Sequence, residues 1–283
     1  MLNIESFLTM NQSYFYLKMK EHKLKVPYTG KERRVRILLP KDYEKDTDRS
    51  YPVVYFHDGQ NVFNSKESFI GHSWKIIPAI KRNPDISRMI VVAIDNDGMG
   101  RMNEYAAWKF QESPIPEQQF GGKGVEYAEF VMEVVKPFIK HKTGWFDGMM
   151  TTGCSMGAYH ALNFFLQHPD VFTKVIALSG VYDARFFVGD YYNDDAIYQN
   201  SPVDYIWNQN DGWFIDRYRQ AEIVLCTGLG AWEQDGLPSF YKLKEAFDQK
   251  QIPAWFAEWG HDVAHDWEWW RKQMPYFLGN LYL

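Results

Sequence analysis

Residues 148–170 read GMMTTGCSMGAYHALNFFLQHPD, and the order of patterns within them is the most informative feature of the sequence. The stretch begins with a short apolar run of the length of a buried strand, and residues 156–168 carry the apolar spacing of a helix, which Pro169 ends. Between the two patterns, residues 153–157 read GCSMG and fit G-x-S-x-G. A strand, a sharp turn with glycines on both sides of Ser155, and a helix together predict a nucleophile elbow, which exposes the serine hydroxyl at the start of the helix.

Strand and helix patterns alternate along most of the chain. Short apolar runs of the kind that parallel sheets bury on both faces are separated by segments with helical spacing. This alternation predicts one α/β domain over residues 1–283, with a central sheet of about eight mostly parallel strands and helices on both of its faces. The first two strands are expected to be antiparallel, and Pro137 is expected to kink the first long helix. The predicted strands are residues 13–20, 34–40, 52–57, 89–95, 148–153, 173–179, 221–227 and 252–259, and the predicted helices are residues 123–142, 156–168, 237–250 and 266–283.

Two segments, residues 96–122 and 181–220, fit neither pattern. Each follows a predicted strand, so both are expected at the carboxyl edge of the sheet, where open α/β folds bind ligands. Both are rich in aromatic residues, which we expect to form a cap-like cover around a small apolar pocket beside Ser155. These residues are Trp108, Phe110, Phe120, Tyr191, Tyr192, Trp207, Trp213 and Phe214, with Trp108, Trp207 and Trp213 as the preferred pocket residues.

Composition and charge argue against several classes of partner. The net charge of −5 comes from interspersed residues of both signs, without the basic tract of a nucleic-acid-binding protein. No run approaches the length of about 18 apolar residues that a membrane-spanning helix needs, and the first residues lack the basic start and apolar core of a signal peptide. Cys154 and Cys226 both lie in runs that are expected to be buried, which indicates reduced thiols and a cytoplasmic protein.

The predicted nucleophile requires two partners elsewhere in the chain, because a serine hydroxyl needs a base that is itself oriented by an acid. In proteins with this elbow, the acid and then the histidine follow the serine along the chain. His261 and His265 are the only histidines after the predicted strand 221–227. Glu233 and Asp235 lie in the loop directly after that strand. These positions predict one histidine and one acid from each pair, and the residues alone leave both choices open.

The same chemistry needs two N–H donors for the oxygen that becomes negatively charged. One is expected to be the backbone N–H of Met156, the residue after the serine. The other is expected from the loop YFHDGQNVF, in which Gly59 allows a turn and leaves the N–H of Gln60 as the preferred donor. No metal or cofactor is expected, because residues 94–98 (IDNDG) lack the later ligands of a calcium loop and residues 261–265 (HDVAH) lack the glutamate of H-E-x-x-H.

Several blocks of the sequence resemble one known family, and they occur in the family's order: FHDGQNVF, AIDNDGMGRMNEYAAW, GCSMGAYHAL, ALSGVYD and HDWEWWRKQMPYFL. Over residues 30–280 the chain resembles the Putative esterase family of α/β-hydrolases, which includes enterochelin-type esterases, feruloyl esterases, S-formylglutathione hydrolase and the mycolyltransferases. The resemblance implies the α/β-hydrolase fold and a small-molecule ester as substrate. It also implies that HDGQ is the oxyanion loop and that the aromatic-rich segment beginning at His265 is the catalytic histidine segment.

The resemblance separates the alternatives that the residues leave open. It favours His265 as the base, because the family's histidine is followed closely by an aromatic residue and then by the terminal helix. It favours Glu233 as the acid, with Asp235 as the runner-up, because the family places a glycine three residues before its acid. Arg101 and Glu104 match a recurrent R-x-x-E-Y element, which implies a buried ion pair that braces the site.

The expected function is hydrolysis of carboxylic esters of short acyl or compact aromatic acids, through an acyl-enzyme on Ser155. The alternative is an acyltransferase that uses the same residues with an alcohol or thiol acceptor, although the lack of an export signal argues against the extracellular role of the mycolyltransferases. A non-catalytic binding protein is disfavoured by the complete set of serine, acid and histidine. The expected partner is a small-molecule ester, with no nucleic acid and no membrane, and assembly into a homo-oligomer is left open.

Overall fold

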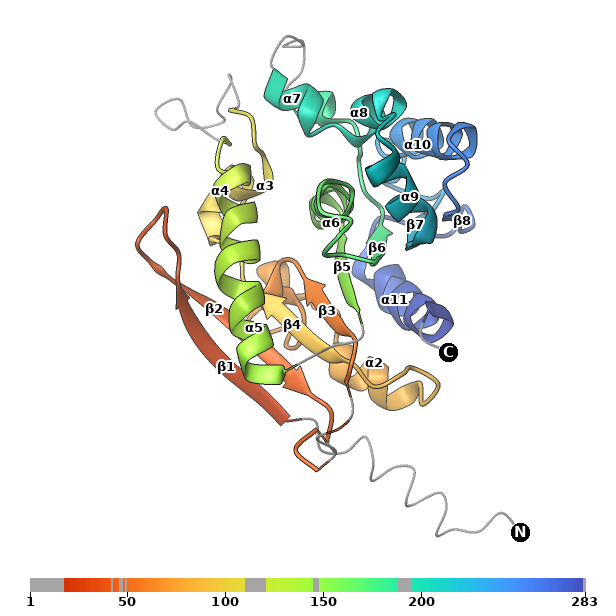
Figure 1. Ribbon diagram of the computed structural model, residues 1–283. Helices are drawn as coiled ribbons and strands as arrows, with labels where there is room; N and C mark the ends of the chain where they lie inside the picture. The colour runs from red at the N-terminus through yellow and green to blue at the C-terminus, as the bar shows by residue number, and fades with distance from the viewer. Residues whose placement is uncertain are drawn as a thin grey trace, which may run out of the picture.

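The computed structural model describes residues 18–41, 43–45, 48, 50–109, 121–144, 148–187 and 195–281. Within these residues, one eight-stranded sheet has the strand order β1-β2-β4-β3-β5-β6-β7-β8 (Figure 1). The β1–β2 and β2–β4 pairs are antiparallel and all the other pairs are parallel, which confirms the predicted mostly parallel sheet. The strands are β1 (Lys18–Lys25), β2 (Glu32–Leu39), β3 (Val53–Phe56), β4 (Ile90–Ile94), β5 (Met149–Cys154), β6 (Lys174–Leu178), β7 (Glu222–Thr227) and β8 (Trp255–Glu258).

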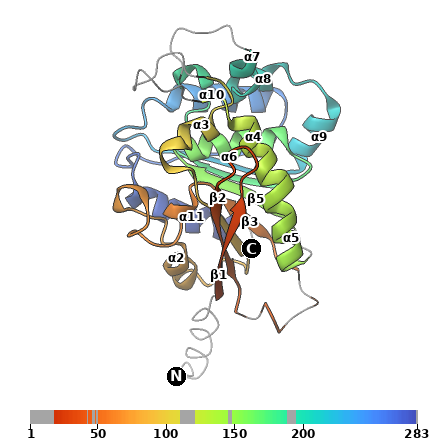
Figure 2. The same cartoon turned by 90° about the vertical axis from the view of Figure 1, so that its left-hand side faces the viewer.

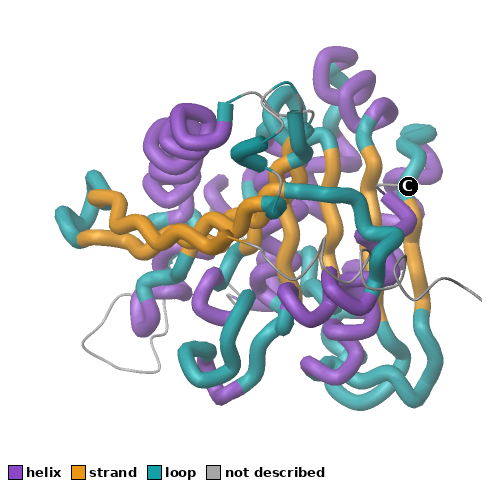
Figure 3. Tube along the Cα trace, turned by 90° about the horizontal axis from the view of Figure 1, so that it is seen from below, coloured by secondary structure: helices purple, strands orange, loops and turns teal. Residues whose placement is uncertain are grey.

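Helices cover both faces of the sheet, as the view from below shows (Figure 3). Residues of α6, α8 and α10 pack on one face, and residues of α2 and α11 pack on the other. The α-helices are α2 (Ile76–Arg82), α3 (Arg101–Tyr105), α4 (Gly124–Glu129), α5 (Lys136–Thr143), α6 (Met156–Gln167), α7 (Asp195–Gln199), α8 (Pro202–Asn208), α9 (Gly212–Gln220), α10 (Leu237–Gln249) and α11 (Trp267–Leu281). Shorter turns are η1 (Gly59–Asn61), η2 (Phe69–Gly71), η3 (Gly98–Gly100) and η5 (Ala184–Phe187), and η4 (Phe130–Val135) is a π-helix.

The core consists of two apolar layers, one on each face of the sheet. Successive side chains of a strand point to opposite faces. In β3, Val53 and Tyr55 therefore belong to the layer that includes α6, whereas Val54 and Phe56 belong to the layer that includes α11. All four residues of β3 are buried, which explains why the strand reads as an uninterrupted apolar run.

The first strand differs from its predicted bounds. β1 covers Lys18–Lys25, whereas the sequence pattern predicts residues 13–20, of which residues 13–17 lie outside the described part of the chain. β1 lies at the edge of the sheet, in front in Figure 2, and most of its side chains are exposed and polar. An exposed edge strand has no buried face to impose a strong alternation of apolar residues, so its end at Lys25 has no clear signal.

The helix around Pro137 contains a widened turn. It runs from α4 through the π-helical η4 into α5, and Pro137 stands in the first turn of α5. Proline has no N–H to donate and its ring crowds the preceding turn, and a π-helical turn is one way in which a helix absorbs such a disturbance. The distortion expected at Pro137 is therefore present as the π-helical turn that precedes it.

The segments 96–122 and 181–220 are helical over much of their described length, which corrects the expectation of irregular structure. The first contains η3 and α3, and the second contains η5, α7, α8 and α9, while residues 110–120 and 188–194 lie outside the described residues. The α-helices are five to nine residues long, too short for a reliable helical period in the sequence. No helix in the described part of the chain combines the length and apolar character that crossing a membrane requires.

Candidate active site

Ser155 lies between β5 and α6 with a φ of 56° and a ψ of −129°. This backbone conformation is uncommon for a residue with a side chain and costs about 1–3 kcal/mol, and such strain is concentrated at functional sites. Glycines on both sides make the turn possible. A Cβ on Gly153 would lie 2.5 Å from the backbone of Gly157, and a Cβ on Gly157 would lie 3.1 Å from Oδ2 of Asp58. The strand, the tight turn and the helix of the predicted elbow are all present.

His265 is the histidine that lies beside the serine. Its Nε2 is 3.0 Å from Oγ of Ser155, which is within hydrogen-bond distance. The residue stands just before α11, and its backbone N–H donates to the carbonyl oxygen of Ala231 at 2.9 Å, so the loop that carries the candidate acids also fixes the histidine. His261 is exposed, and its backbone carbonyl lies against Gly230. The structure therefore brings His265, and not His261, to Ser155.

Glu233 is buried behind His265, with 1% of its surface exposed. Its Oε2 lies 3.6 Å from Nδ1 of His265, which is longer than a good hydrogen bond but typical of catalytic contacts that tighten when substrate binds. The same carboxylate accepts hydrogen bonds from the hydroxyls of Ser179 at 2.6 Å and Thr227 at 3.2 Å. Asp235, the runner-up, is exposed and also lines the cavity beside Ser155. Of the two acids, Glu233 is placed to orient the imidazole.

Replacing the acid tests this assignment. Glu233→Ala is expected to lower kcat/KM for a short-chain ester by about 10³–10⁴-fold, because the imidazole loses the group that orients it and stabilises its charged form. Asp235→Ala is the matched control, since it removes the carboxylate two residues after Glu233, which lines the same cavity. It is expected to lower kcat/KM far less. Steady-state kinetics of both variants provide the measurement. A large loss with Asp235→Ala alone would show that the acid is assigned to the wrong residue.

The candidate oxyanion loop, residues 57–60, turns sharply after β3. A Cβ on Gly59 would lie 2.5 Å from the backbone of Ile94, so this position accepts only glycine. Nη2 of Arg36 donates to the carbonyl oxygen of Gly59 at 2.7 Å. Because the C=O and N–H of one trans peptide point in opposite directions, this bond directs the N–H of Gln60 away from Arg36. Gln60 is not among the described residues that line the cavity beside Ser155, so its role as second donor stays a prediction.

Met156, the predicted first donor to the oxyanion, lies directly at the candidate active site. It is the first residue of α6 and lines the cavity beside Ser155. The first N–H groups of a helix have no partner within the helix and lie at its positive end, so the N–H of Met156 is available to a developing negative charge. The structure thus places the donor predicted from the elbow at the nucleophile.

Arg101 and Glu104 do not pair with each other as predicted; each forms an ion pair with another residue, and the pair made by Arg101 lies at the candidate oxyanion loop. Arg101 instead binds both carboxylate oxygens of Asp58, at 2.7 and 2.8 Å, while Glu104 binds Arg33 at 2.6 and 2.9 Å. Burial opposes the charge on Asp58, but the positive charge and hydrogen bonds of Arg101 outweigh this effect and lower the pKa of the carboxyl. Arg101 is partly buried and Glu104 is fully buried. Each forms its ion pair with a residue that is distant in the sequence.

A cavity of about 160 Å³ opens beside the serine. Both Ser155 and His265 line it, so an ester bound there would have its carbonyl group next to the nucleophile and the base. Trp232 is 81% exposed and has a φ of 68°, which is rare for a residue with a side chain. The described apolar residues that line the cavity are Met156, Val181, Phe186, Phe187 and Trp232.

The three tryptophans predicted to form the pocket do not line this cavity. Trp108 is buried and stacks on Phe187, so it supports the wall from behind. Trp207 is half-buried against the main core, and Trp213 is exposed on α9 with the guanidinium of Arg217 over its ring. Aromatic content alone could not show which rings face the serine. Phe110, Phe120, Tyr191 and Tyr192 lie outside the described residues, and Phe214 packs partly buried against the core.

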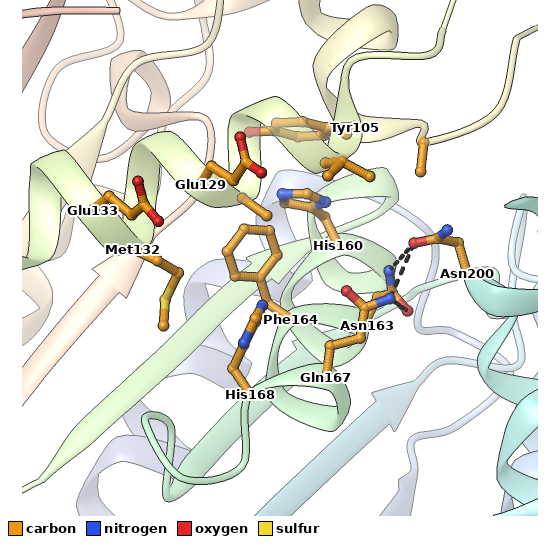
Figure 4. Close-up of a pocket in the computed structure, with 14 residues that line it drawn as sticks. Tyr105, Glu129, Met132, Glu133, His160, Asn163, Phe164, Gln167, His168 and Asn200 are labelled. Atoms are coloured by element: carbon orange, nitrogen blue, oxygen red, sulfur yellow. Dashed lines mark hydrogen bonds between the residues drawn. The ribbon is translucent and has the colours of Figure 1, made fainter. Parts of the chain in front are cut away.

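A second cavity, of about 350 Å³, lies between the α4–η4 helix and α6 (Figure 4). Its wall includes Phe164 and Met132 together with the exposed Glu129 and the buried His160. Burial holds the pKa of His160 well below its usual value, so this imidazole is neutral at physiological pH. Ser155 is absent from the described lining of this cavity, so we place the chemistry at the smaller cavity.

Comparisons with known proteins place the chain in a family. The sequence model of a family described as Putative esterase matches residues 27–281. A ferulic acid esterase structure superposes with a TM-score of 0.69 at 21% identity, over 95% of this chain and 98% of that chain. An IroE-like serine hydrolase from Shewanella oneidensis superposes with a TM-score of 0.67 at 17% identity, over 94% of this chain and 80% of that chain. The uncharacterized protein YbbA of Bacillus subtilis is 24% identical over 155 residues, which is 53% of this chain and 57% of that protein.

Proposed function

Because the chain belongs to the Putative esterase family, we propose that it is a serine esterase that hydrolyses small carboxylic esters through Ser155, His265 and Glu233. The observation that carries the proposal is the 3.0 Å contact between Nε2 of His265 and Oγ of Ser155 at the strained turn before α6. The buried carboxylate of Glu233 on the other side of the imidazole supports it. A structural serine would need neither partner.

In the proposed reaction, Oγ of Ser155 attacks the carbonyl carbon of the ester while Nε2 of His265 takes the hydroxyl proton. The carboxylate of Glu233 stabilises the imidazolium that forms. The backbone N–H groups of Met156 and Gln60 donate to the negative oxygen of the tetrahedral intermediate. His265 then gives its proton to the leaving alcohol, and the acyl group remains on Ser155.

Hydrolysis is completed by water. His265 takes a proton from the water as it attacks the acyl-enzyme, and Ser155 regains its proton when the acid leaves. Transfer to an alcohol or thiol would pass through the same acyl-enzyme. The products formed from one ester with and without added alcohol or thiol acceptors therefore distinguish the two reactions.

The volume of the cavity limits the length of the acyl group that can bind. At about 160 Å³, with Val181, Phe186 and Phe187 in its wall, it accommodates a short acyl chain. Each added methylene first gains about 0.8 kcal/mol of burial, but once the cavity is full it must displace packed rings at a cost of about 1–3 kcal/mol. Activity on p-nitrophenyl esters is therefore expected to peak between acetyl and butyryl and to fall sharply by octanoyl.

Two variants test the wall assignment in the same ester series. Phe186→Ala removes a ring from the cavity wall and is expected to move the maximum towards longer chains. Trp213→Ala removes an exposed ring outside the described lining and is expected to leave the maximum unchanged. A wild-type series that rises steadily to long chains, with activation at lipid interfaces, would contradict the small cavity and indicate a lipase.

A further inference from the structure

A chain of buried hydrogen bonds connects the last helix to the candidate acid. Nε1 of Trp270, in α11, lies 2.9 Å from Oγ of Ser179, which follows β6 directly. Oγ of Ser179 lies 2.6 Å from Oε1 of Glu233. Trp270, Ser179 and Glu233 are 5%, 3% and 1% exposed, so these bonds form away from bulk water. A short buried bond to a carboxylate is among the stronger hydrogen bonds in proteins.

The direction of this chain is fixed by the chemistry of its members. An indole N–H can only donate, and a carboxylate can only accept. Ser179 therefore accepts from Trp270 and must give its single hydroxyl proton to Glu233. The hydroxyl of Thr227 is a weaker donor to the carboxylate, because its one proton is shared between Oε2 of Glu233 at 3.2 Å and the carbonyl oxygen of Gly228 at 3.0 Å. Ser179 is thus the dedicated side-chain donor to the carboxylate.

The backbone of Ser179 adopts a strained conformation, which indicates that its side chain has a functional role. Its φ is 54°, a left-handed conformation in which glycine would be easier to accommodate. Its backbone N–H donates to the carbonyl oxygen of Cys226 at 2.7 Å, which anchors the residue to β7. A strained residue that keeps a side chain at such a position is typical of a functional site.

We propose that Ser179 and Trp270 are positioning residues that hold the carboxylate of Glu233 so that its Oε2 faces Nδ1 of His265. With Oε1 bound by Ser179, the carboxylate cannot rotate freely, and its second oxygen stays directed towards the imidazole. Trp270 also contacts the histidine itself, with the two rings edge to face and their centroids 5.0 Å apart. One side chain of α11 therefore contacts the histidine directly and is connected to the acid through Ser179. This inference rests on the proposed function, because it requires that Glu233 acts through His265.

The experiment measures kcat and KM of the full-length protein for p-nitrophenyl acetate. Ser179→Ala is expected to lower kcat about 10- to 100-fold with little change in KM, as for loss of a hydrogen bond to a charged group. Trp270→Phe keeps an aromatic ring but removes the donor, and is expected to lower kcat about three- to tenfold. The matched control is Trp267→Phe, which removes an indole from the same buried cluster of α11 without touching Ser179. It is expected to leave kcat nearly unchanged.

A second set of measurements shows whether the effect passes through the acid. In a Glu233→Gln background, Ser179→Ala and Trp270→Phe should have little further effect on kcat, because residues that act as a unit are not additive. Thermal unfolding of each variant separates lost packing from lost positioning. If both substitutions affect kcat no more than Trp267→Phe, or remain fully damaging in the Glu233→Gln background, the positioning role is wrong. If Ser155→Ala and Glu233→Gln are themselves harmless, the proposed function fails instead.

Discussion

Ester hydrolysis by the Ser155→Ala variant is expected to fall by at least about 10⁴-fold relative to the natural protein. The substitution removes the atom that forms the acyl-enzyme, and water would have to attack without covalent catalysis. The activity that remains would come from the oxyanion donors and substrate binding alone. The measurement is kcat/KM for p-nitrophenyl acetate on protein of verified folding.

The fold should tolerate this change, which makes the result interpretable. Oγ of Ser155 is hydrogen-bonded to His265, and the turn is fixed by its glycines and by the bond from the Ser155 backbone N–H to the carbonyl oxygen of Leu178. Neither of these backbone features depends on the hydroxyl. Near-normal activity of a well-folded Ser155→Ala protein would remove the basis of the proposed mechanism.

His265→Ala is expected to cause a loss of the same order as Ser155→Ala, because the members of a catalytic triad act as a unit. Without the imidazole, the hydroxyl of Ser155 keeps its proton and is a poor nucleophile at neutral pH. For the same reason, the double variant should be little worse than either single variant. The measurement is again kcat/KM on a short-chain ester.

His261→Ala is the matched control for the base, since it removes an imidazole from the same loop. This side chain is exposed and lies away from the described lining of the cavity beside Ser155. Its removal is expected to cost much less, mainly through the packing of its loop against Gly230. If His261→Ala were the damaging change and His265→Ala the mild one, the base would be assigned to the wrong residue.

The elbow could be predicted from the sequence because its signal is local. The apolar run, the glycines around Ser155 and the helical spacing after it are consecutive, so one stretch contains the whole motif. The order of the strands is different. β4 lies between β2 and β3, and this crossover depends on contacts between residues far apart in the chain. Short helices such as α7 and α8 were also not predictable, because each spans too few residues to show a period.

The candidate catalytic residues were predictable because chain order and family pattern both restrict them. The acid must follow β7 and the histidine must follow the last strand, which left few candidates. The packing around them could not be predicted in this way. Arg101 pairs with Asp58 instead of Glu104, because the pairing is decided by where η1 and α3 meet in space, not by spacing in the sequence. Ser179 carries a weak signal, since a serine directly after β6 appears in the family-like block ALSGVYD.

The exposed rings beside the serine could not be distinguished from the other aromatic residues. Nothing in the sequence separates Trp232 and Phe186, which line the cavity, from Trp207 and Trp213, which do not. The position of Phe186 depends on the path of the chain after β6, and that of Trp232 depends on the loop after β7. Trp232 directly precedes Glu233 in a loop whose sequence pattern indicates a catalytic acid but gives no sign that a ring beside it lines the cavity.

The central claim is that Ser155 is the nucleophile, and covalent labelling tests it most directly. A serine-reactive phosphonate is incubated with the natural protein, residual esterase activity is followed, and the labelled peptide is identified by mass spectrometry. The account predicts one phosphonate per chain, attached to Ser155, with activity lost in proportion to labelling and no labelling of Ser155→Ala. A label at another residue that accompanies the loss of activity, or full activity after Ser155 is labelled, would contradict it.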